Sequence, residues 1–342
     1  MVGLAAAVAL AASAWILGPA LRGGAHGTPP AAPSDFRLAP LLVPAEDLVA
    51  SGIPRDGLRP LREPHAVPPA ELDALDAGER GKLLVPDDLV AGIVVAGQAR
   101  AYPLRVLNWH ELALDTLGGR PIVVAFSPLA FGVRAFDREV DGRALDFGVS
   151  GLLVDSALVM YDRVETLDAS SLWDGLRGRA IAGPAASRSL RLAAIPVSLT
   201  TWGAWRRSHP ETTVVVPSGD LLKMYRRDPY GSYYRTGKLR FAASPVPPDG
   251  EPLPWMTPVA VLDPEGHEPI VVALDSRGFA LAALDPADAP GVRFACAAAA
   301  DRCDVEVDAD GAPEVAYALW FAWHAARPET RARLVSPPTT AR

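Results

Sequence analysis

The stretch that decides the fold runs from residue 121 to 163 and reads PIVVAFSPLAFGVRAFDREVDGRALDFGVSGLLVDSALVMYDR. It contains four apolar runs, PIVVAF, GVRAFDRE, ALDFGVSG and SALVMYDR, separated by residues typical of turns, such as Asp141-Gly142. Runs of this length and spacing predict short strands joined by tight turns. The sequence therefore predicts an α+β fold of mostly antiparallel β-sheet with short helices.

Strand signals begin before this stretch, near Leu89, in LVAGIVVAG and QARAYPLRVL. Two short helices are expected beside the strands. The first is NWHELALDTL, residues 108–117, and we expect Gly118-Gly119 to end it. The second is TTWGAWRRSH, residues 200–209, which Thr200 or Thr201 can cap and Pro210 ends.

A weak internal repeat indicates two modules. TWGAWRRSHPET at 201–212 resembles LWFAWHAARPET at 319–330, and a strand-rich block precedes each copy. The two tryptophans of each copy are three residues apart, hence on one helix face, and packing in the core is their simplest role. The second block is shorter, so the fold is expected to contain two unequal repeated modules.

The domain boundaries follow from these features and from composition. A Pro-rich segment, SPVPPDGEPLPWMTP, separates the two modules and is typical of a linker. The expected units are an N-terminal anchor or signal segment, a Pro-rich spacer and lead-in, a first β-rich module, the linker, and a second, reduced module: residues 1–22, 23–82, 83–243, 244–258 and 259–335.

Composition excludes one class of partner. The 342 residues are 49% apolar and 21% charged, as in a globular protein, and the net charge is −7. No basic stripe with interleaved aromatic residues is present. Nucleic acid is therefore not an expected partner.

The N-terminus indicates an extracytoplasmic location. Residues 1–21 contain no charged side chain and would span about 30 Å as a helix, enough to cross a bilayer. They lack the basic start and the clear cleavage site of a signal peptide. We expect an uncleaved membrane anchor, with a cleaved signal as the alternative and a buried soluble helix as a third reading.

Cys296 and Cys303 are the only cysteines, and they flank the six residues AAAADR. In an extracytoplasmic protein a disulfide between them is expected. A free buried pair is the alternative, and two cysteines alone make a poor metal site.

His110 and Glu111 are the first candidates for chemistry. On a helix, His110 would share an apolar face with Leu107, Leu114 and Leu117, which favours a buried histidine satisfied by a hydrogen bond. The functional alternative is a metal ligand or a general base. Because position 114 is leucine, the sequence contains no HExxH motif here.

Ser127 is the one reactive side chain in the loop between two apolar runs. No G-x-S-x-G elbow surrounds it, and Pro128 offers no N–H for an oxyanion hole, so a catalytic serine is not expected. Arg138 and the pair Asp162-Arg163 follow strand-like runs, where such groups are usually structural, with anion binding as the alternative.

His209 ends the tryptophan helix, and its counterpart in the repeat is Arg327. That substitution favours stabilisation of the helix end over metal binding, although His110 and His209 remain the candidate metal ligands. The run DPYGSYY, residues 228–234, is interpreted as an aromatic turn that packs as a lid. The sequence identifies no cofactor.

Taken together, several motifs resemble a known family. ARAYPLRVLNWHEL, FSPLAFGVRAFDR, FGVSGLLVDSALVMYDR, SLWDGLRGRAIAGP, TTWGAWRRSHPET and DPYGSYY occur in the order seen in the bacterial family called domain of unknown function 3179. The resemblance runs from about Pro86 to Thr330 and implies an extracytoplasmic or membrane-anchored protein. His110, Glu111, Arg138, Asp162, Arg163 and His209 match the family pattern.

One departure from that pattern concerns the loop. The family typically has Tyr-Cys-Pro-Leu-Cys where this chain has Phe126, Ser127, Pro128, Leu129 and Ala130. Serine and alanine supply no thiolate, so any thiol or soft-metal chemistry of the relatives is not expected here.

The sequence thus predicts an extracytoplasmic, membrane-anchored binding or scaffold protein with an altered or vestigial site around His110, Glu111 and Ser127. The alternative is a metal-binding protein or enzyme that uses His110 and Glu111. A purely structural partner of a membrane complex is the third possibility.

Overall fold

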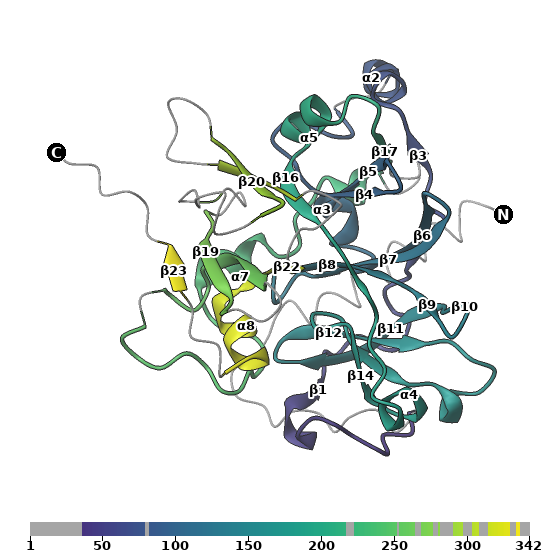
Figure 1. Cartoon of the computed structure of the whole chain (residues 1–342), viewed down its shortest axis with the longest axis vertical. Coiled ribbons are helices and arrows are strands. Elements are labelled where there is room, and N and C mark those ends of the chain that lie inside the picture. Colours follow the sequence, from purple (N-terminus) through teal and green to yellow (C-terminus); the bar gives the residue numbers. More distant parts are fainter. Residues whose placement is uncertain are drawn as a thin grey trace.

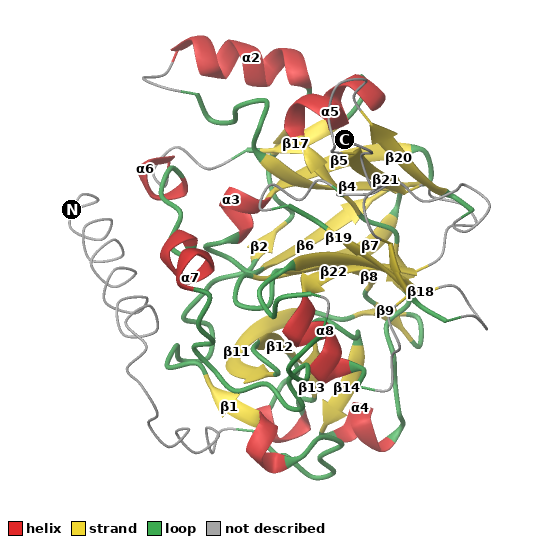
Figure 2. Ribbon diagram, turned by 90° about the vertical axis from the view of Figure 1, so that its left-hand side faces the viewer, coloured by secondary structure: helices red, strands yellow, loops and turns green. Residues whose placement is uncertain are grey.

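The computed structural model of the chain describes residues 36–78, 82–216, 222–251, 253–263, 268–275, 280, 290–296, 303–307, 314–328 and 333–335. Three β-sheets stack on one another with short helices around them (Figures 1 and 2). The upper, central and lower sheets are named here by their places in Figure 2. The fold is α+β with mostly antiparallel strand pairs, as the sequence predicts.

The upper sheet has the strand order β16-β4-β5-β17-β3. Its strands are β3 (Ala66–Val67), β4 (Leu89–Val95), β5 (Gln98–Pro103), β16 (Ser198–Thr201) and β17 (Thr213–Val215). The lower sheet has the order β1-β11-β12-β13-β14. Its strands are β1 (Leu48–Ala50), β11 (Phe147–Val154), β12 (Ala157–Asp162), β13 (Leu172–Asp174) and β14 (Arg179–Ala182).

The central sheet has nine strands in the order β2-β6-β7-β8-β22-β18-β19-β23, with β15 paired to β8. Its strands are β2 (Leu61–Arg62), β6 (Leu112–Leu117), β7 (Arg120–Ser127), β8 (Gly132–Asp137), β15 (Ala194–Ile195), β18 (Pro258–Asp263), β19 (Ile270–Ala273), β22 (Glu314–Leu319) and β23 (Arg333–Val335). Two hairpins complete the strands, β9 (Glu139–Val140) with β10 (Arg143–Ala144) and β20 (Val292–Cys296) with β21 (Cys303–Val307).

The helices among the described residues are short. The α-helices are α2 (Pro69–Gly78), α3 (Leu104–Leu107), α4 (Pro184–Ser187), α5 (Trp202–Ser208), α6 (Leu222–Tyr225), α7 (Gly231–Thr236) and α8 (Trp320–Ala326). Two 3₁₀ turns, η1 (Ala45–Asp47) and η2 (Leu167–Ala169), complete the set. In Figure 2, α3, α6 and α7 lie along one side of the stacked sheets.

The central sheet is buried on both faces, which explains its nearly continuous apolar strands. Along β7, Ile122, Val124 and Phe126 join the core shared with the upper sheet. Val123 and Ala125, which alternate with them, join the core shared with the lower sheet. Since successive side chains of a strand point to opposite faces, a strand covered on both sides needs apolar residues at every position.

The helix expected over residues 108–117 is wrong. The structure has only the single turn α3 before this segment and the strand β6 within it, paired to β7. Gly118 and Gly119, with φ of 57° and 77°, form the two-residue hairpin turn between β6 and β7 rather than a helix end. His110 therefore does not lie on a helix face with Leu114 and Leu117.

The expected tryptophan helix is confirmed as α5. The hydroxyl of Thr201 accepts a hydrogen bond from the Ala204 amide, which is an N-cap, and the helix ends at Ser208. Trp202 and Trp205 are both buried and pack in the core outside the upper sheet.

Two four-stranded units, one in each expected module, have the same strand order and the same senses. In the order β16-β4-β5-β17 the first two pairs are antiparallel and the last is parallel, and β22-β18-β19-β23 repeats this pattern. The registers also correspond, because Thr201 lies opposite Leu89 and Leu319 lies opposite Pro258. That the units arose as copies remains an interpretation.

The two expected modules share a sheet. Strand β22 of the second module pairs with β8 of the first, at Tyr317 and Val133, and thereby extends the central sheet. The hydroxyl of Tyr317 also donates to the carbonyl of Val197 and accepts from the amide of Leu199. The Pro-rich linker therefore joins parts of one continuous core.

The expected membrane anchor, residues 1–22, lies outside the described residues. Within the described part of the chain no helix is both long and apolar enough to span a bilayer. The backbone of the β20–β21 hairpin sets Cys296 opposite Cys303. Directly opposed residues have Cα atoms about 4.5–5.5 Å apart, a separation that disulfides span, and the disulfide remains a prediction.

Candidate functional site

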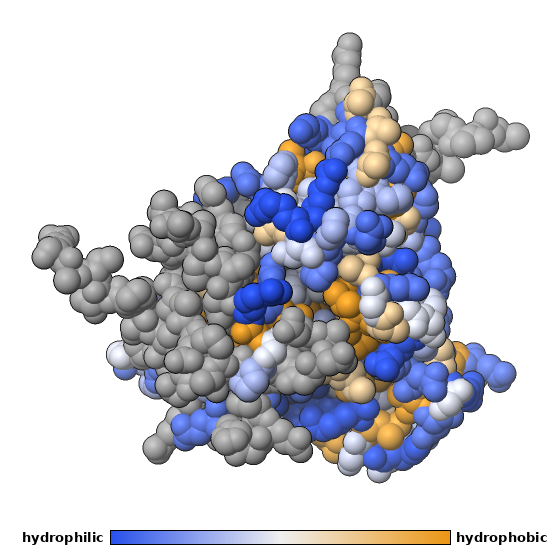
Figure 3. Space-filling view, turned by 45° about the horizontal axis from the view of Figure 1, so that its top comes forward, coloured by the Kyte–Doolittle hydropathy of each residue, from blue (hydrophilic) through white to orange (hydrophobic). Residues whose placement is uncertain are grey.

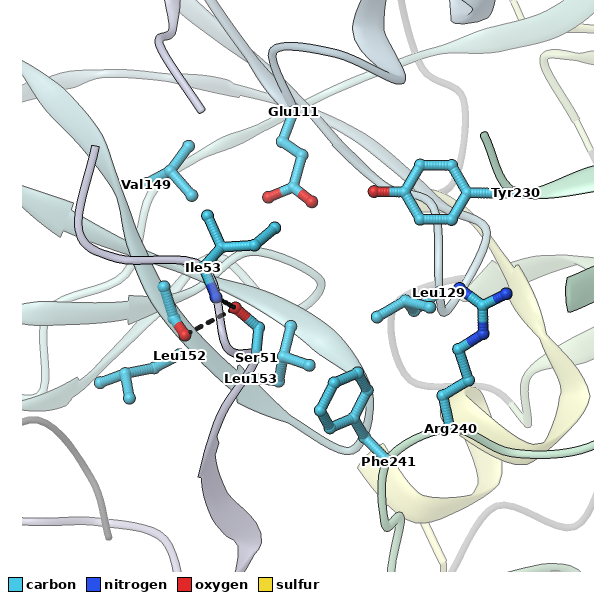
Figure 4. Close-up of a pocket in the computed structure, with 11 residues that line it drawn as sticks. Ser51, Ile53, Glu111, Leu129, Val149, Leu152, Leu153, Tyr230, Arg240 and Phe241 are labelled. Carbon is cyan, nitrogen blue, oxygen red and sulfur yellow. Dashed lines mark hydrogen bonds between the residues drawn. The ribbon is translucent and has the colours of Figure 1, made fainter. Parts of the chain in front are cut away.

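A small cavity lies at one edge of the stacked sheets, between the central and lower sheets. Its walls come from five separate parts of the chain (Figure 4): Ser51 and Ile53 after β1, Glu111 before β6, Leu129 after β7, Val149 and Gly151 to Leu153 on β11, and Tyr230, Arg240 and Phe241 around and after α7. The cavity volume is about 20 Å³, which is room for a water molecule.

Glu111 enters this cavity from an unusual backbone conformation. It joins the turn that ends α3 to the start of β6, and its φ is 58°. Its amide donates to the Leu107 carbonyl at 2.7 Å, and its carbonyl accepts from the Phe126 amide at 2.7 Å. Glycine or asparagine usually occupies this left-handed position after a helix, because other side chains are strained there. A glutamate held at such a position is a reason to look for a role of its side chain.

The Glu111 side chain is buried and points into the cavity. The residue is 8% exposed, and within the described part of the chain its carboxyl group has neither a hydrogen-bond partner nor an ion-pair partner. Burial raises the pKa of Glu111 from 4.5 to about 8. At neutral pH the carboxyl group is therefore protonated, so it can donate one hydrogen bond and accept another.

Tyr230 and Arg240 face Glu111 from the other side of the cavity. Figure 4 shows the Tyr230 hydroxyl pointing toward the carboxyl group and the Arg240 side chain rising beside Leu129. Tyr230 is 4% exposed, and burial raises the pKa of its hydroxyl. The Arg240 guanidinium lies 5.1 Å from the centre of the Tyr233 ring, a cation–π contact.

The opposite wall is fixed by an irregularity in β11. The register between β11 and β12 shifts between Val149 and Leu152, and Gly151 there has φ of 80°. The amide and the hydroxyl of Ser51 both donate to the Gly151 carbonyl at 2.9 Å. A Cβ at position 151 would lie 2.3 Å from the Ile53 carbonyl oxygen, so only glycine permits this close approach.

His110 is committed to structural hydrogen bonds. Its Nδ1 lies 2.6 Å from the Arg59 carbonyl oxygen, and its Nε2 lies 2.6 Å from the Tyr225 hydroxyl. Because a carbonyl only accepts, Nδ1 carries the proton and Nε2 accepts from Tyr225. Burial lowers the pKa of His110, which keeps the ring neutral. Neither nitrogen is left for a metal, as the structural interpretation of the sequence anticipates.

The loop that contains Ser127 is also held tightly. The Ser127 hydroxyl accepts a hydrogen bond from the Leu158 amide at 2.9 Å and is not part of the cavity wall. The hydroxyls of Tyr233 and Tyr234 donate to the carbonyls of Leu129 and Pro128 at 2.8 and 2.5 Å. The aromatic run is thus a packed cover over the loop, and Leu129 is the loop residue that reaches the cavity.

Arg138, Asp162 and Arg163 have structural partners. Arg138 donates to the carbonyls of Ile122 and Leu145, at the end of the β7–β8 pair. Asp162 accepts from the Ser171 amide and the Trp173 indole, at 2.5 and 3.0 Å.

Arg163 forms an ion pair with Asp56, and Asp56 also accepts a hydrogen bond from the Tyr161 hydroxyl at 2.6 Å. These contacts tie the loop after β1 to the end of β12, behind the cavity wall. Arg138, Asp162 and Arg163 do not line the cavity.

His209 lies in a different place, at the end of α5 beside the upper sheet. Its ring packs against Trp205 in a tilted arrangement, with 3.9 Å between ring centres, and it borders a surface groove with Arg100 and Thr213. His209 and His110 therefore do not share a pocket. Among the residues that the structure describes, no group of three His, Cys, Asp or Glu side chains could hold a metal ion.

Of the seven residues expected in a pocket, the structure places Glu111 alone in the cavity. Tyr230 and Arg240 complete its polar lining, and they are more than a hundred residues from Glu111 in the sequence. Tyr230 lies in the DPYGSYY run, which was a signal for a cover. Arg240 had no local signal, because only the tertiary fold brings it to the cavity.

Comparisons with known proteins give a family and no function. No curated protein and no solved structure matches the chain. A family model described as protein of unknown function, DUF3179, matches residues 55–278. That range includes Glu111, Tyr230 and Arg240 and covers more than half of the chain. The protein belongs to the DUF3179 family.

Proposed function

We propose that this protein is an extracytoplasmic, membrane-anchored binding protein whose ligand site is the cavity around Glu111. The observation that carries the proposal is the Glu111 carboxyl group, which is buried, without a partner in the described part of the chain, and directed into an enclosed space. A buried polar group normally has a hydrogen-bond partner, and its exceptions call for a bound molecule or a function.

Several features support binding rather than the metal or thiol chemistry considered from the sequence. His110 uses both ring nitrogens in hydrogen bonds within the protein. Ser127 and Ala130 lie where relatives are expected to have cysteines. The Ser127 hydroxyl oxygen already accepts a hydrogen bond from the Leu158 amide. What remains at the cavity is a set of hydrogen-bonding groups with apolar walls, the usual lining of a small-molecule site.

The location rests on the N-terminal sequence. The uncharged residues 1–21 predict an anchor, and the chain after them would lie outside the cytoplasm. Fractionation of cells that express the full chain tests this part. We expect the full chain in the membrane fraction and a chain that begins at Phe36 in the soluble fraction.

Binding at the cavity is tested with a panel of small organic acids, amines and neutral polyols, by thermal unfolding and native mass spectrometry. Filling the cavity with Leu129→Trp should abolish any stabilisation that the wild-type protein shows, while Leu42→Trp, at an exposed position, should not. Stabilisation that is identical in Leu129→Trp would place the site elsewhere. Catalytic turnover of a panel compound that Glu111→Gln abolishes would make the cavity an active site instead.

A further inference from the structure

The side chains of Arg240, Tyr230 and Glu111 in the cavity can all donate hydrogen bonds. Arg240 Nη1 is buried, and within the described residues it has no hydrogen-bond partner. A guanidinium group is always charged and only donates. A guanidinium N–H that is buried without an acceptor is costly, and the described residues provide no acceptor for Arg240 Nη1.

Glu111 and Tyr230 are further donors that face the cavity and can bond to an acceptor there. The carboxyl group of Glu111 is protonated at neutral pH because burial raises its pKa to about 8, and the Tyr230 hydroxyl remains protonated because burial raises its pKa too. A neutral carboxylic acid beside a tyrosine hydroxyl is an arrangement that binds negatively charged oxygen in other proteins. The described structure contains no ion pair between Glu111 and Arg240, so the positive charge is not neutralised from within the cavity.

The remaining lining is apolar or already bonded. The Ser51 hydroxyl donates to the Gly151 carbonyl, and Ile53, Val149, Leu152, Leu153, Leu129 and Phe241 supply hydrocarbon surface. A complementary ligand therefore carries a negative charge, has oxygen acceptors, and has an apolar part. Arg240 would repel an ammonium group, and among the described residues no acidic side chain other than Glu111 lines the cavity.

We propose that the cavity binds small aliphatic carboxylates, with Arg240 supplying the charge and Tyr230 and Glu111 supplying hydrogen bonds to the carboxylate oxygens. This inference rests on the proposed function, since it names the ligand class of the same site. The groups that face Glu111 are Tyr230 and Arg240 on the covering side and uncharged residues on the β1 and β11 sides.

Entry requires a movement of the cover. The cavity of about 20 Å³ is filled by one water-sized group, and acetate is larger. The segment that follows α7 is tied to the turn between β11 and β12 by two contacts, the Ser156 hydroxyl to the Phe241 carbonyl at 3.0 Å and the Ser244 amide to Asp155 at 3.3 Å. This segment belongs to no strand, so it can move away and return with Arg240 without unpairing a sheet.

Exposed large apolar side chains are few among the described residues. On the face in Figure 3, apolar areas are interspersed with hydrophilic ones. The exposed large apolar side chains are Leu42, Leu75, Val85, Val164 and Trp255, in separate segments of the sequence. Apolar residues scattered in this way are ordinary on a protein surface.

The test is isothermal titration calorimetry of the full chain with sodium acetate and sodium propionate, with ethylammonium chloride and sodium chloride as controls. We expect both carboxylates to bind and neither control to do so. Arg240→Gln should weaken binding at least about tenfold, because it removes a charge-assisted hydrogen bond. Arg235→Gln, on the exposed side of α7, is the matched control and should leave the affinity unchanged.

The pH dependence of carboxylate affinity shows whether Glu111 takes part in binding or has only a structural role. As the pH rises past about 8, Glu111 ionises and repels the anion, so the wild-type affinity should be about tenfold lower at pH 9 than at pH 7. Glu111→Gln keeps a neutral hydrogen-bond donor that does not titrate. Its affinity, whatever the value at pH 7, should therefore be the same at pH 9.

Two results overturn the carboxylate proposal. One is acetate and propionate binding that Arg240→Gln does not change. The other is the absence of carboxylate binding while a different class of compound binds in a manner sensitive to Leu129→Trp, which would leave the proposed binding function intact. If no compound binds at the cavity and a crystal structure shows only a buried water there, both proposals fail together.

Discussion

Replacing Glu111 with glutamine tests whether the buried carboxyl group is neutral in the folded protein. The pKa is about 8 in the folded state, against an ordinary value of 4.5 in the unfolded chain. Between these two values the folded state keeps a proton that the unfolded state has lost. The free energy of unfolding therefore falls as the pH rises from 4.5 to 8, and above 8 the loss is complete.

The magnitude follows from the size of the pKa difference. Each unit is worth about 1.4 kcal/mol, so Glu111 destabilises the folded protein by about 3 kcal/mol at pH 7 and about 5 kcal/mol above pH 8, relative to acid pH. Glutamine has nearly the same shape and does not titrate. Glu111→Gln should therefore be close to the wild type at pH 4.5 and more stable by about 3 kcal/mol at pH 7.

Urea denaturation followed by tryptophan fluorescence, at pH values from 4.5 to 8.5, measures this difference. Other buried groups such as Asp155 and Asp162 also have raised pKa values, but they are present in both proteins and cancel in the difference. Glu251→Gln, at an exposed position, is the control and should show no pH-dependent change. Parallel pH profiles for Glu111→Gln and the wild type would mean that Glu111 is ionised in the folded state, and the reasoning would be wrong.

Three further variants test other parts of the fold. Thr201→Ala removes the cap of α5 and should lower the free energy of unfolding by about 1 kcal/mol, whereas Thr201→Ser should restore it. Gly92→Ala would place a Cβ 2.3 Å from the Trp205 ring and should cost about 1–3 kcal/mol by overpacking; a change below 0.5, on the order of a surface substitution, would contradict the close contact. The double variant Ser127→Cys with Ala130→Cys should form a disulfide on mild oxidation, because the two positions are the ends of one β-turn; two freely alkylated thiols after oxidation would argue against that geometry.

The sequence predicted the α+β class because the strand runs are apolar, short and separated by turn residues. It failed at residues 108–117, where the spacing of leucines in LALDTL fits a helix face and a strand equally well. Gly118 and Gly119 did not decide between the two, because their positive φ angles suit a hairpin turn as well as a helix end. Local patterns did not distinguish the two, and pairing with β7 did.

The site was predictable only in part, for a related reason. Glu111 stood out as an acidic residue beside a histidine in an apolar setting, and the structure places it in the cavity. Its expected partner, His110, instead bonds to Arg59 and Tyr225. Since neighbours in sequence on such a tight turn point in different directions, adjacency of His110 and Glu111 did not imply a shared site. Arg240 lines the same cavity as Glu111 because of long-range packing, which leaves no trace in local sequence.

The cavity lies outside the two similar four-stranded units. The units consist of residues 89–103 with 198–215 and of residues 258–273 with 314–335. No cavity-lining residue lies in either unit. The lining comes from the N-terminal segment, from the long stretch between β5 and β16, and from the segment after β17.

This arrangement separates the scaffold from the site. The stretch between β5 and β16 contains the lower sheet strands β11 to β14 as well as Glu111, while the corresponding interval between β19 and β22 contains the β20–β21 hairpin among its described residues. Features that both units share, such as the buried pairs of tryptophans, are explained by packing. The cavity depends on segments outside the two similar units, so the pattern that the units share does not account for a buried carboxyl group at a strained position there, whereas the proposed binding role does.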